Sequence, residues 1–114
     1  MGKVRSILAT FLACISLQSF AAGSITAKVL AIRVDQTGNG MVIFDQNVGG
    51  SPPGCVTSTY QKALAFNTNT SAGKAIYAMA LSAKAMDSTI TANGLGSCSV
   101  FGSYVEDWDY GVLQ

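Results

Sequence analysis

The sequence predicts a small α+β domain that is mostly β, with a single helix. Three observations lead to this prediction. Short runs of β-branched and aromatic residues are separated by turns rich in Gly and Asn. One alanine-rich stretch without proline has helical periodicity. Two cysteines remain once a predicted leader is set aside, which is typical of a small disulfide-stabilised domain. The expected order of elements is β-β-β-α-β-β.

The first three strands are expected before the helix. Residues 25–34 alternate, with Ile25, Ala27 and Val29 on one face, and the apolar residues near the end of the run predict burial on both faces there. Gly38-Asn39-Gly40 is typical of a tight reversal because Gly and Asn tolerate positive φ. Residues 41–44 then return as the second strand of a hairpin, and residues 60–66 form the third strand.

The helix is predicted over residues 72–86, with Thr70 or Ser71 as its N-cap. Four apolar residues recur at helical spacing and are expected to form its buried stripe: Ile76, Met79, Ala83 and Met86.

Two or three strands are expected after the helix. Residues 88–92 form the fourth strand, residues 93–96 a turn, and residues 98–101 a candidate extension of the sheet. Residues 105–113 form the last strand. Strict alternation places Glu106, Trp108, Tyr110 and Val112 on one face of that strand.

This order of elements fits a small five-stranded barrel of the OB type, in which a helix lies between the third and fourth strands. The alternative is an open antiparallel sheet with one helix packed on one face. The order of elements does not separate the two architectures.

Residues 1–22 have the layout of a secretory signal peptide. Lys3 and Arg5 provide a basic start, residues 6–17 an apolar run, and residues 19–22 small side chains for cleavage after Ala21 or Ala22. The apolar run is shorter than the roughly 20 residues needed to cross a bilayer. We expect residues 23–114 to be a single domain, either periplasmic or secreted, with no membrane span after cleavage.

Two cysteines, Cys55 and Cys98, remain in that domain. An even pair in a small exported domain predicts a disulfide, which would stabilise the fold by roughly 4 kcal/mol in the chain-entropy model. The alternative is a reactive thiol pair, which usually requires close spacing and a lowered thiol pKa. These two cysteines are far apart in sequence, and neither has an adjacent base.

Composition excludes several classes of function. Without Lys3 and Arg5 the chain has five basic and six acidic residues and no basic patch, which argues against a nucleic-acid partner. There is no histidine, so neither a Ser-His-Asp nor a Cys-His site can form. With both cysteines paired, no thiolate nucleophile or zinc site remains. We therefore predict no enzymatic activity, no metal and no cofactor.

The best candidate surface is the run from Tyr104 to Tyr110, which holds three aromatic and three acidic residues. Acids accept hydrogen bonds from sugar hydroxyls, and aromatic rings cover apolar sugar faces or serve protein interfaces. The candidate ligand-binding residues are Tyr104, Glu106, Trp108 and Tyr110. The alternative is an ordinary terminal strand with its rings in the core and its acids in water.

Taken together, the chain resembles small exported bacterial proteins similar to the B subunit of subtilase cytotoxin, an AB5 toxin. Five features carry the resemblance: residues 29–34, the Pro/Gly loop before Cys55, residues 63–67, residues 70–75, and residues 94–102 before the acidic strand. The resemblance implies an OB-like barrel, a Cys55–Cys98 disulfide and a ring of five subunits that binds glycans. The leading hypothesis is therefore an exported, non-catalytic module that binds a glycan or a cell-surface receptor. The alternative is a periplasmic protein-interaction or structural protein.

Overall fold

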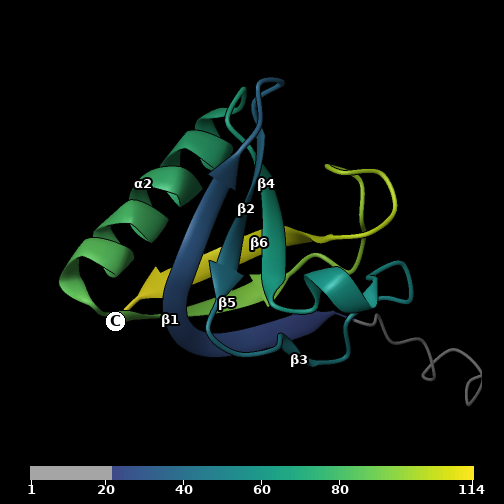
Figure 1. The fold of residues 1–114 in the computed structure, drawn as a ribbon, viewed down its shortest axis with the longest axis horizontal. Coiled ribbons are helices and arrows are strands. Elements are labelled where there is room, and N and C mark those ends of the chain that lie inside the picture. Colours follow the sequence, from purple (N-terminus) through teal and green to yellow (C-terminus); the bar gives the residue numbers. More distant parts are fainter. Residues whose placement is uncertain (1–21) are drawn as a thin grey trace, which may run out of the picture.

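The computed structural model describes residues 22–114 and has an α+β architecture, a six-stranded mixed sheet with one long helix (Figure 1). Its elements are β1 (Gly23–Val34), β2 (Asn39–Phe44), β3 (Gly49–Gly50), the 3₁₀ turn η1 (Ser58–Tyr60), β4 (Ala63–Asn67), α2 (Ser71–Met86), β5 (Thr89–Gly94) and β6 (Glu106–Leu113). Leaving out the two-residue β3, the order is the predicted β-β-β-α-β-β. The predicted signal peptide lies outside the described residues, apart from Ala22.

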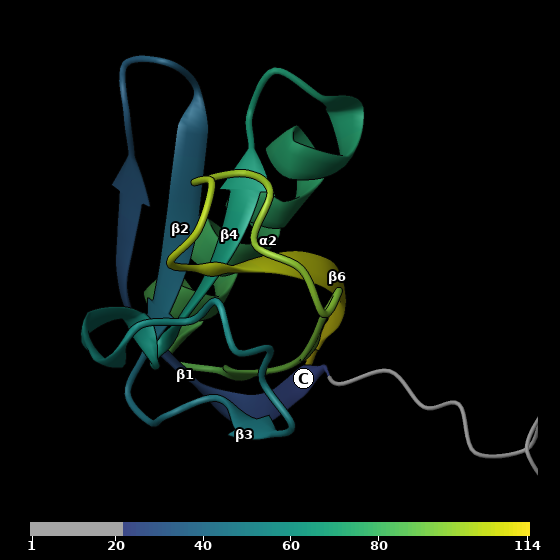
Figure 2. The same ribbon diagram turned by 90° about the vertical axis from the view of Figure 1, so that its right-hand side faces the viewer.

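The strands hydrogen-bond in a ring. Their order in the sheet is β2-β4-β6-β5-β1-β3, and a further pairing between β2 and β1 closes the circuit. The pairs are antiparallel except for β4 and β6, which run parallel. Figure 2 shows β2 and β4 side by side, with β6 passing behind the loop that precedes it. The ring therefore joins strands that lie far apart in the sequence, such as β1 with β5.

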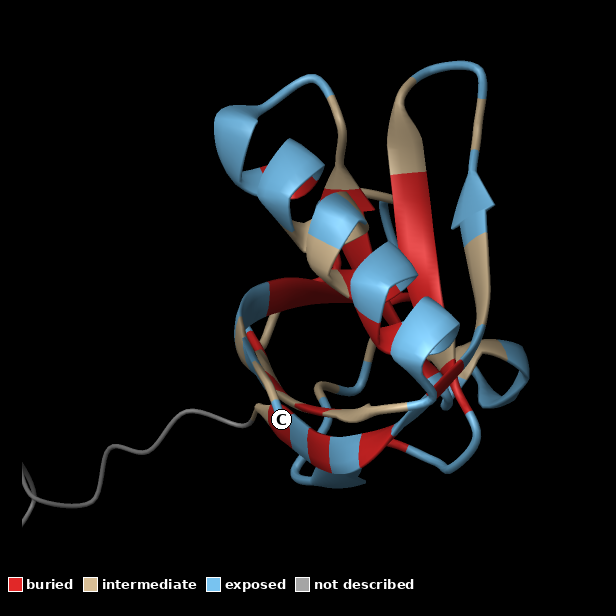
Figure 3. Cartoon of the chain, turned by 90° about the vertical axis from the view of Figure 1, so that its left-hand side faces the viewer, coloured by how far each residue is buried: buried red, intermediate tan, exposed pale blue. Residues whose placement is uncertain are grey.

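Strand β1 contributes to both halves of the ring. Its first half pairs with β5 and its second half with β2, and the register shifts between Val29 and Ala31. The first half alternates between buried and exposed residues, seen as red and pale blue bands in Figure 3. Past the shift, Ile32 packs against the core while Val34 is exposed. The expected burial on both faces at the end of this strand is wrong, because the strand extends beyond the core as a hairpin arm.

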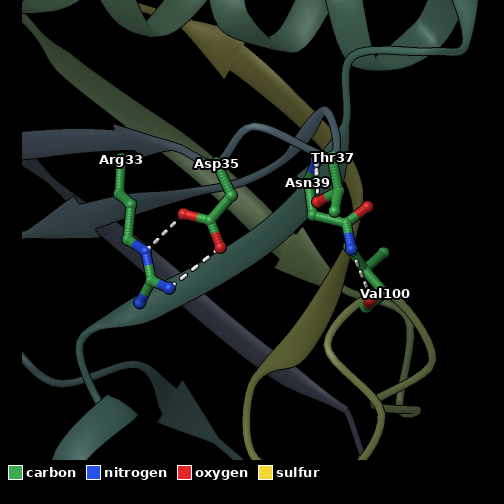
Figure 4. A network of polar contacts seen from close by, with 5 residues as sticks. All are labelled: Arg33, Asp35, Thr37, Asn39 and Val100. Carbon is green, nitrogen blue, oxygen red and sulfur yellow. Dashed lines mark hydrogen bonds and ion pairs between the residues drawn. The ribbon is translucent and has the colours of Figure 1, made fainter.

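The β1–β2 reversal lies a few residues earlier than predicted. Gly38 takes the positive φ of +94°, while Asn39 already belongs to β2, and Asp35 N–H donates to Asn39 O at 2.7 Å. Asp35 also accepts two hydrogen bonds from Arg33, and Asn39 Nδ2 donates to Val100 O at 3.1 Å (Figure 4). The arm is therefore fastened to the loop that follows β5.

Three other segments differ from expectation. Tyr60 ends η1, so β4 begins only at Ala63. Strand β5 continues to Gly94, two residues into the predicted turn. Residues 98–101 form an irregular loop instead of a strand, because the backbone N–H groups of Ser99 and Val100 bond to the Asp107 side chain and not to the backbone of a strand.

Helix α2 is capped at both ends. Thr70 is the N-cap, and its hydroxyl accepts a hydrogen bond from Gly73 N–H at 2.9 Å. Asp87 ends the helix in the left-handed conformation, and its N–H bonds back to the last turn. These contacts satisfy backbone groups that a helix otherwise leaves without partners.

The buried face of α2 is close to the predicted stripe. Ala80 and Ala83 are fully buried, and Ile76 and Met79 pack against the core. Met86 is 58% exposed, so its prediction as a core residue is wrong. Within the last turn Ala83 is the residue that belongs to the core, and Met86 lies outside it.

The Cys55–Cys98 disulfide is present and joins the segment after β3 to the loop after β5. Such a bond fits an oxidising, extracytoplasmic location. Among residues 22–114, no helix has both the length and the apolar character that crossing a bilayer requires.

Candidate functional site

The aromatic and acidic residues predicted to bind ligand lie in separate environments. Trp108 is only 7% exposed, and its ring lies 6.3 Å from that of Phe44 in the main core. Tyr110 is 56% exposed, and its hydroxyl accepts a hydrogen bond from Asn93. A β-bulge separates them, since the adjacent residues Asn93 and Gly94 pair with Tyr110 and Trp108. Asp109 is the extra residue. The expectation that Trp108 and Tyr110 share a face is therefore wrong.

Tyr104 lies in a second, smaller apolar cluster. Its ring is 5.0 Å from that of Tyr60 and 5.7 Å from that of Phe101. Together the three rings cover a patch of core that includes Val105, and Arg33 lies over the Phe101 ring at 5.5 Å. Tyr104 thus belongs to the smaller core cluster and lies apart from Trp108, which belongs to the main one.

Glu106 is the predicted residue with an unusual environment. It is 1% exposed at the start of β6. Its Oε2 accepts hydrogen bonds from Gly23 N–H at 2.9 Å and from Gly96 N–H at 3.1 Å. Its Oε1 is buried and has no hydrogen-bond partner among the described residues. Buried polar atoms almost always have a partner, so this oxygen requires an explanation.

Two glycines make the space for this carboxyl group. A Cβ atom on Gly94 would lie 2.0 Å from Glu106 Oε2, and one on Gly23 would lie 2.5 Å from Oε1. Any side chain at either position would displace the carboxyl group from its backbone donors. The position of Glu106 is therefore set by β1, β5 and the turn at Gly96.

Glu106 also lines a pocket of about 300 Å³. The pocket's remaining lining comes from the loop around β3 and from the segment that leads into β4: Asn47, Val48, Pro52, Pro53, Val56, Tyr60, Gln61 and Ala63. One wall is apolar, while the amides of Asn47 and Gln61 and the Tyr60 phenol supply hydrogen-bonding groups. This combination of an apolar wall with a few polar groups is common in small-molecule sites.

The loop that walls this pocket is held by long-range bonds. The disulfide at Cys55 ties it to Cys98, and β3 pairs with the start of β1 through Gly49 and Gly50. The Pro/Gly loop before Cys55 can be recognised in the sequence, but nothing there indicates that this loop faces Glu106. That proximity comes from the disulfide and from the pairing of β3 with β1.

Asp107, the neighbour of Glu106, organises the loop before β6. Its carboxylate accepts hydrogen bonds from the Ser97 hydroxyl, from the Ser99 N–H and hydroxyl, and from the Val100 N–H, at 2.6–2.9 Å. Burial by itself raises the pKa of Asp107, but these donors outweigh it, and the net effect lowers the pKa below 3.8. Asp107 also borders a groove of about 190 Å³ beside the start of α2. Its oxygens are already engaged by protein donors.

The side chains that line the main pocket offer hydrogen-bond donors and acceptors and one acidic group. Its lining has one carboxylate, one phenol and two amides, with no lysine, arginine or cysteine. None of these lining groups forms a nucleophile-base pair. Across residues 22–114, no group of three or more acidic or cysteine side chains has the arrangement of a metal site.

Comparison of the chain with protein-family models, with curated proteins and with solved structures finds no match in any of the three. The resemblance to the toxin B subunit therefore rests on the sequence features alone.

Proposed function

We propose that this protein is an exported, non-catalytic binding module built on an OB-like barrel, and that it binds a glycan of a cell surface in the manner of an AB5 toxin B subunit. The observation that carries the proposal is the pocket of about 300 Å³ between the loop around β3 and Glu106. The remaining support comes from topology, the disulfide and the sequence resemblance.

The ring of hydrogen bonds supports the barrel over an open sheet. Strand β1 pairs with both β2 and β5, and the parallel β4–β6 pair closes the opposite side. The helix connects β4 to β5. An OB-type barrel has this connectivity, whereas an open sheet would lack at least one of the pairings that complete the ring.

The pocket lining supports a sugar as the ligand. Sugars present hydroxyl groups at their edges and apolar C–H groups on their faces. Asn47, Tyr60 and Gln61 offer hydrogen bonds to the edges, while Pro52 and Pro53 offer an apolar surface. No basic group lines the pocket to balance an acidic ligand. Neutral sugars are therefore the expected class.

The disulfide supports export to an oxidising compartment, and we place the protein in the periplasm or outside the cell. By resemblance to the toxin subunit, we propose assembly into a ring of five subunits. Analytical ultracentrifugation of the exported protein would measure this directly.

A glycan array probed with the purified exported protein tests the binding function. We expect saturable binding to a set of neutral glycans, and we expect Gln61→Ala to reduce it at least tenfold. Gln36→Ala is the matched control, because Gln36 is an exposed glutamine in the β1–β2 turn and does not line the pocket. An array with no hits contradicts the glycan proposal, and equal losses in both variants contradict the assignment of the pocket.

The outer face of β6 favours protein interaction as a second candidate. Tyr110 and Val112 are both more than half exposed on this strand. Exposed aromatic residues are enriched at protein interfaces. Tyr110→Ser should abolish capture of a periplasmic partner while leaving glycan binding unchanged.

A further inference from the structure

The unpartnered oxygen of Glu106 points to a device that goes beyond ligand binding. We propose that cleavage after Ala22 makes Gly23 the first residue of the mature protein, and that its new α-ammonium group forms a buried ion pair with Glu106. Leader removal would then complete the fold as well as release the chain.

The first support is the geometry at Gly23. Its backbone nitrogen already lies 2.9 Å from Glu106 Oε2. Oε1 is also close to this residue, because a Cβ on Gly23 would come within 2.5 Å of it. Both carboxylate oxygens are therefore next to Gly23. An amide nitrogen has one proton to donate, whereas an α-ammonium group has three.

The second support is the charge of the site. Among the described residues the ion pairs are Lys28–Asp87 and Arg33–Asp35, and neither includes Glu106. A buried carboxylate with two backbone donors and no cation is costly, since buried charges are normally paired. An ammonium group on Gly23 supplies the missing positive charge and a donor for Oε1.

The third support is the position of Gly23 in the sequence. It directly follows Ala22, one of the two predicted cleavage positions. Cleavage after Ala21 would leave Gly23 as an internal amide and Oε1 without a partner. The structure therefore favours the later of the two positions. It also explains why the residue after the leader is a glycine, because a side chain would collide with the carboxyl group.

The experiment uses the full chain, exported and purified. Intact-mass measurement is expected to show a mature protein that begins at Gly23. A second chain carries Ser-Gln inserted between Ala22 and Gly23, so that Gly23 stays internal after processing. We expect this insertion to lower the melting temperature by at least about 4 °C. A mature protein that begins at any other residue overturns the proposal.

A double-mutant cycle shows whether Glu106 is responsible. In Glu106→Gln the insertion should change the melting temperature by less than about 1 °C, since the pair is already broken. Asp109→Asn is the control, because Asp109 is an exposed acid on the same strand. In this variant the insertion should lower the melting temperature as much as it does in the native chain. If the insertion lowers the melting temperature equally in the native chain, in Glu106→Gln and in Asp109→Asn, the proposal is wrong.

A chemical measurement keeps the test decisive if Glu106→Gln fails to fold. Amine-acylating reagents attack only the unprotonated amine, and the ion pair holds the amine protonated. The α-amine of the native mature protein should therefore react at least about tenfold more slowly near pH 7 than that of the insertion variant. Equal rates contradict the ion pair.

Discussion

The carboxylate of Asp107 accepts both the backbone N–H and the hydroxyl of Ser99 through the same oxygen, at 2.9 and 2.6 Å. This contact shapes the loop that leads from the disulfide to the last strand. It also makes the loop sensitive to acid. Hydrogen bonds to the charged form lower the pKa of Asp107 despite its burial.

Acid should weaken the fold through Asp107. Its pKa is lowered in the folded state, so its contribution is complete above the pKa of an unfolded aspartate, about 3.9. The contribution is lost as the pH falls from there through the lower folded value. Asp107→Asn should therefore be less stable than the native chain at pH 7, and the difference in melting temperature should shrink below about pH 4. Asp109→Asn, at the exposed acid two residues on, should show no such pH-dependent difference. Melting curves across this range provide the test, and parallel behaviour of the two variants would contradict the role of Asp107.

Removal of the disulfide should cost about 4 kcal/mol, because the bond closes a long loop in the unfolded chain. We suggest Cys55→Ser with Cys98→Ser, so that no free thiol remains. Urea denaturation of this double variant and of the native protein, with and without reductant, measures the loss. Reductant should destabilise only the native protein. Equal stability of the two proteins without reductant would show that the bond contributes nothing.

Trp108 and Tyr110 should respond very differently to truncation, although they are two residues apart. Trp108→Ala removes a buried ring beside Phe44 and should cost about 3–5 kcal/mol. Tyr110→Ala removes a half-exposed ring and should cost less than about 1 kcal/mol. Far-ultraviolet circular dichroism in urea measures both. Similar costs would mean that the bulge at Asp109 is absent.

Gly94 should be intolerant of any side chain. A methyl group there would lie 2.0 Å from Glu106 Oε2, which Gly23 and Gly96 hold in place, so Gly94→Ala should cost more than about 2 kcal/mol. Gly54→Ala is the control, because nothing lies within 4 Å of its added Cβ. That change should be neutral or should stabilise by up to about 1 kcal/mol. Thermal melting distinguishes the two, and a tolerated Gly94→Ala would contradict the position of Glu106.

Local patterns in the sequence predicted which helix and strands form better than they predicted where each one begins and ends. The alanine-rich periodicity located α2 and its cap at Thr70, and the cysteine pair predicted the disulfide. The bulges were beyond sequence reasoning, because an extra residue in a strand is recognised only against its partner. One such bulge moves Trp108 and Tyr110 to opposite faces.

The residues of the pocket could also be predicted only in part. The composition of its strand identified Glu106 as a candidate, but Tyr60 and Gln61 were both predicted to be ordinary members of the third strand. They line the pocket together with the loop around β3, which a disulfide and a two-residue pairing bring toward Glu106. Contacts between residues that are distant in the sequence produce no periodic pattern from which they could be predicted.

The parallel contact of Leu64 with Glu106 and of Ala65 with Asp107 has a consequence for when the protein can fold. Strand β6 comes last in chain order, yet it fills the gap between β4 and β5. Until it arrives, both of those strands have a bare edge, and the circuit cannot close. A chain that still lacks β6 therefore cannot close the ring, and the protein acquires its final shape only once its last strand has been made.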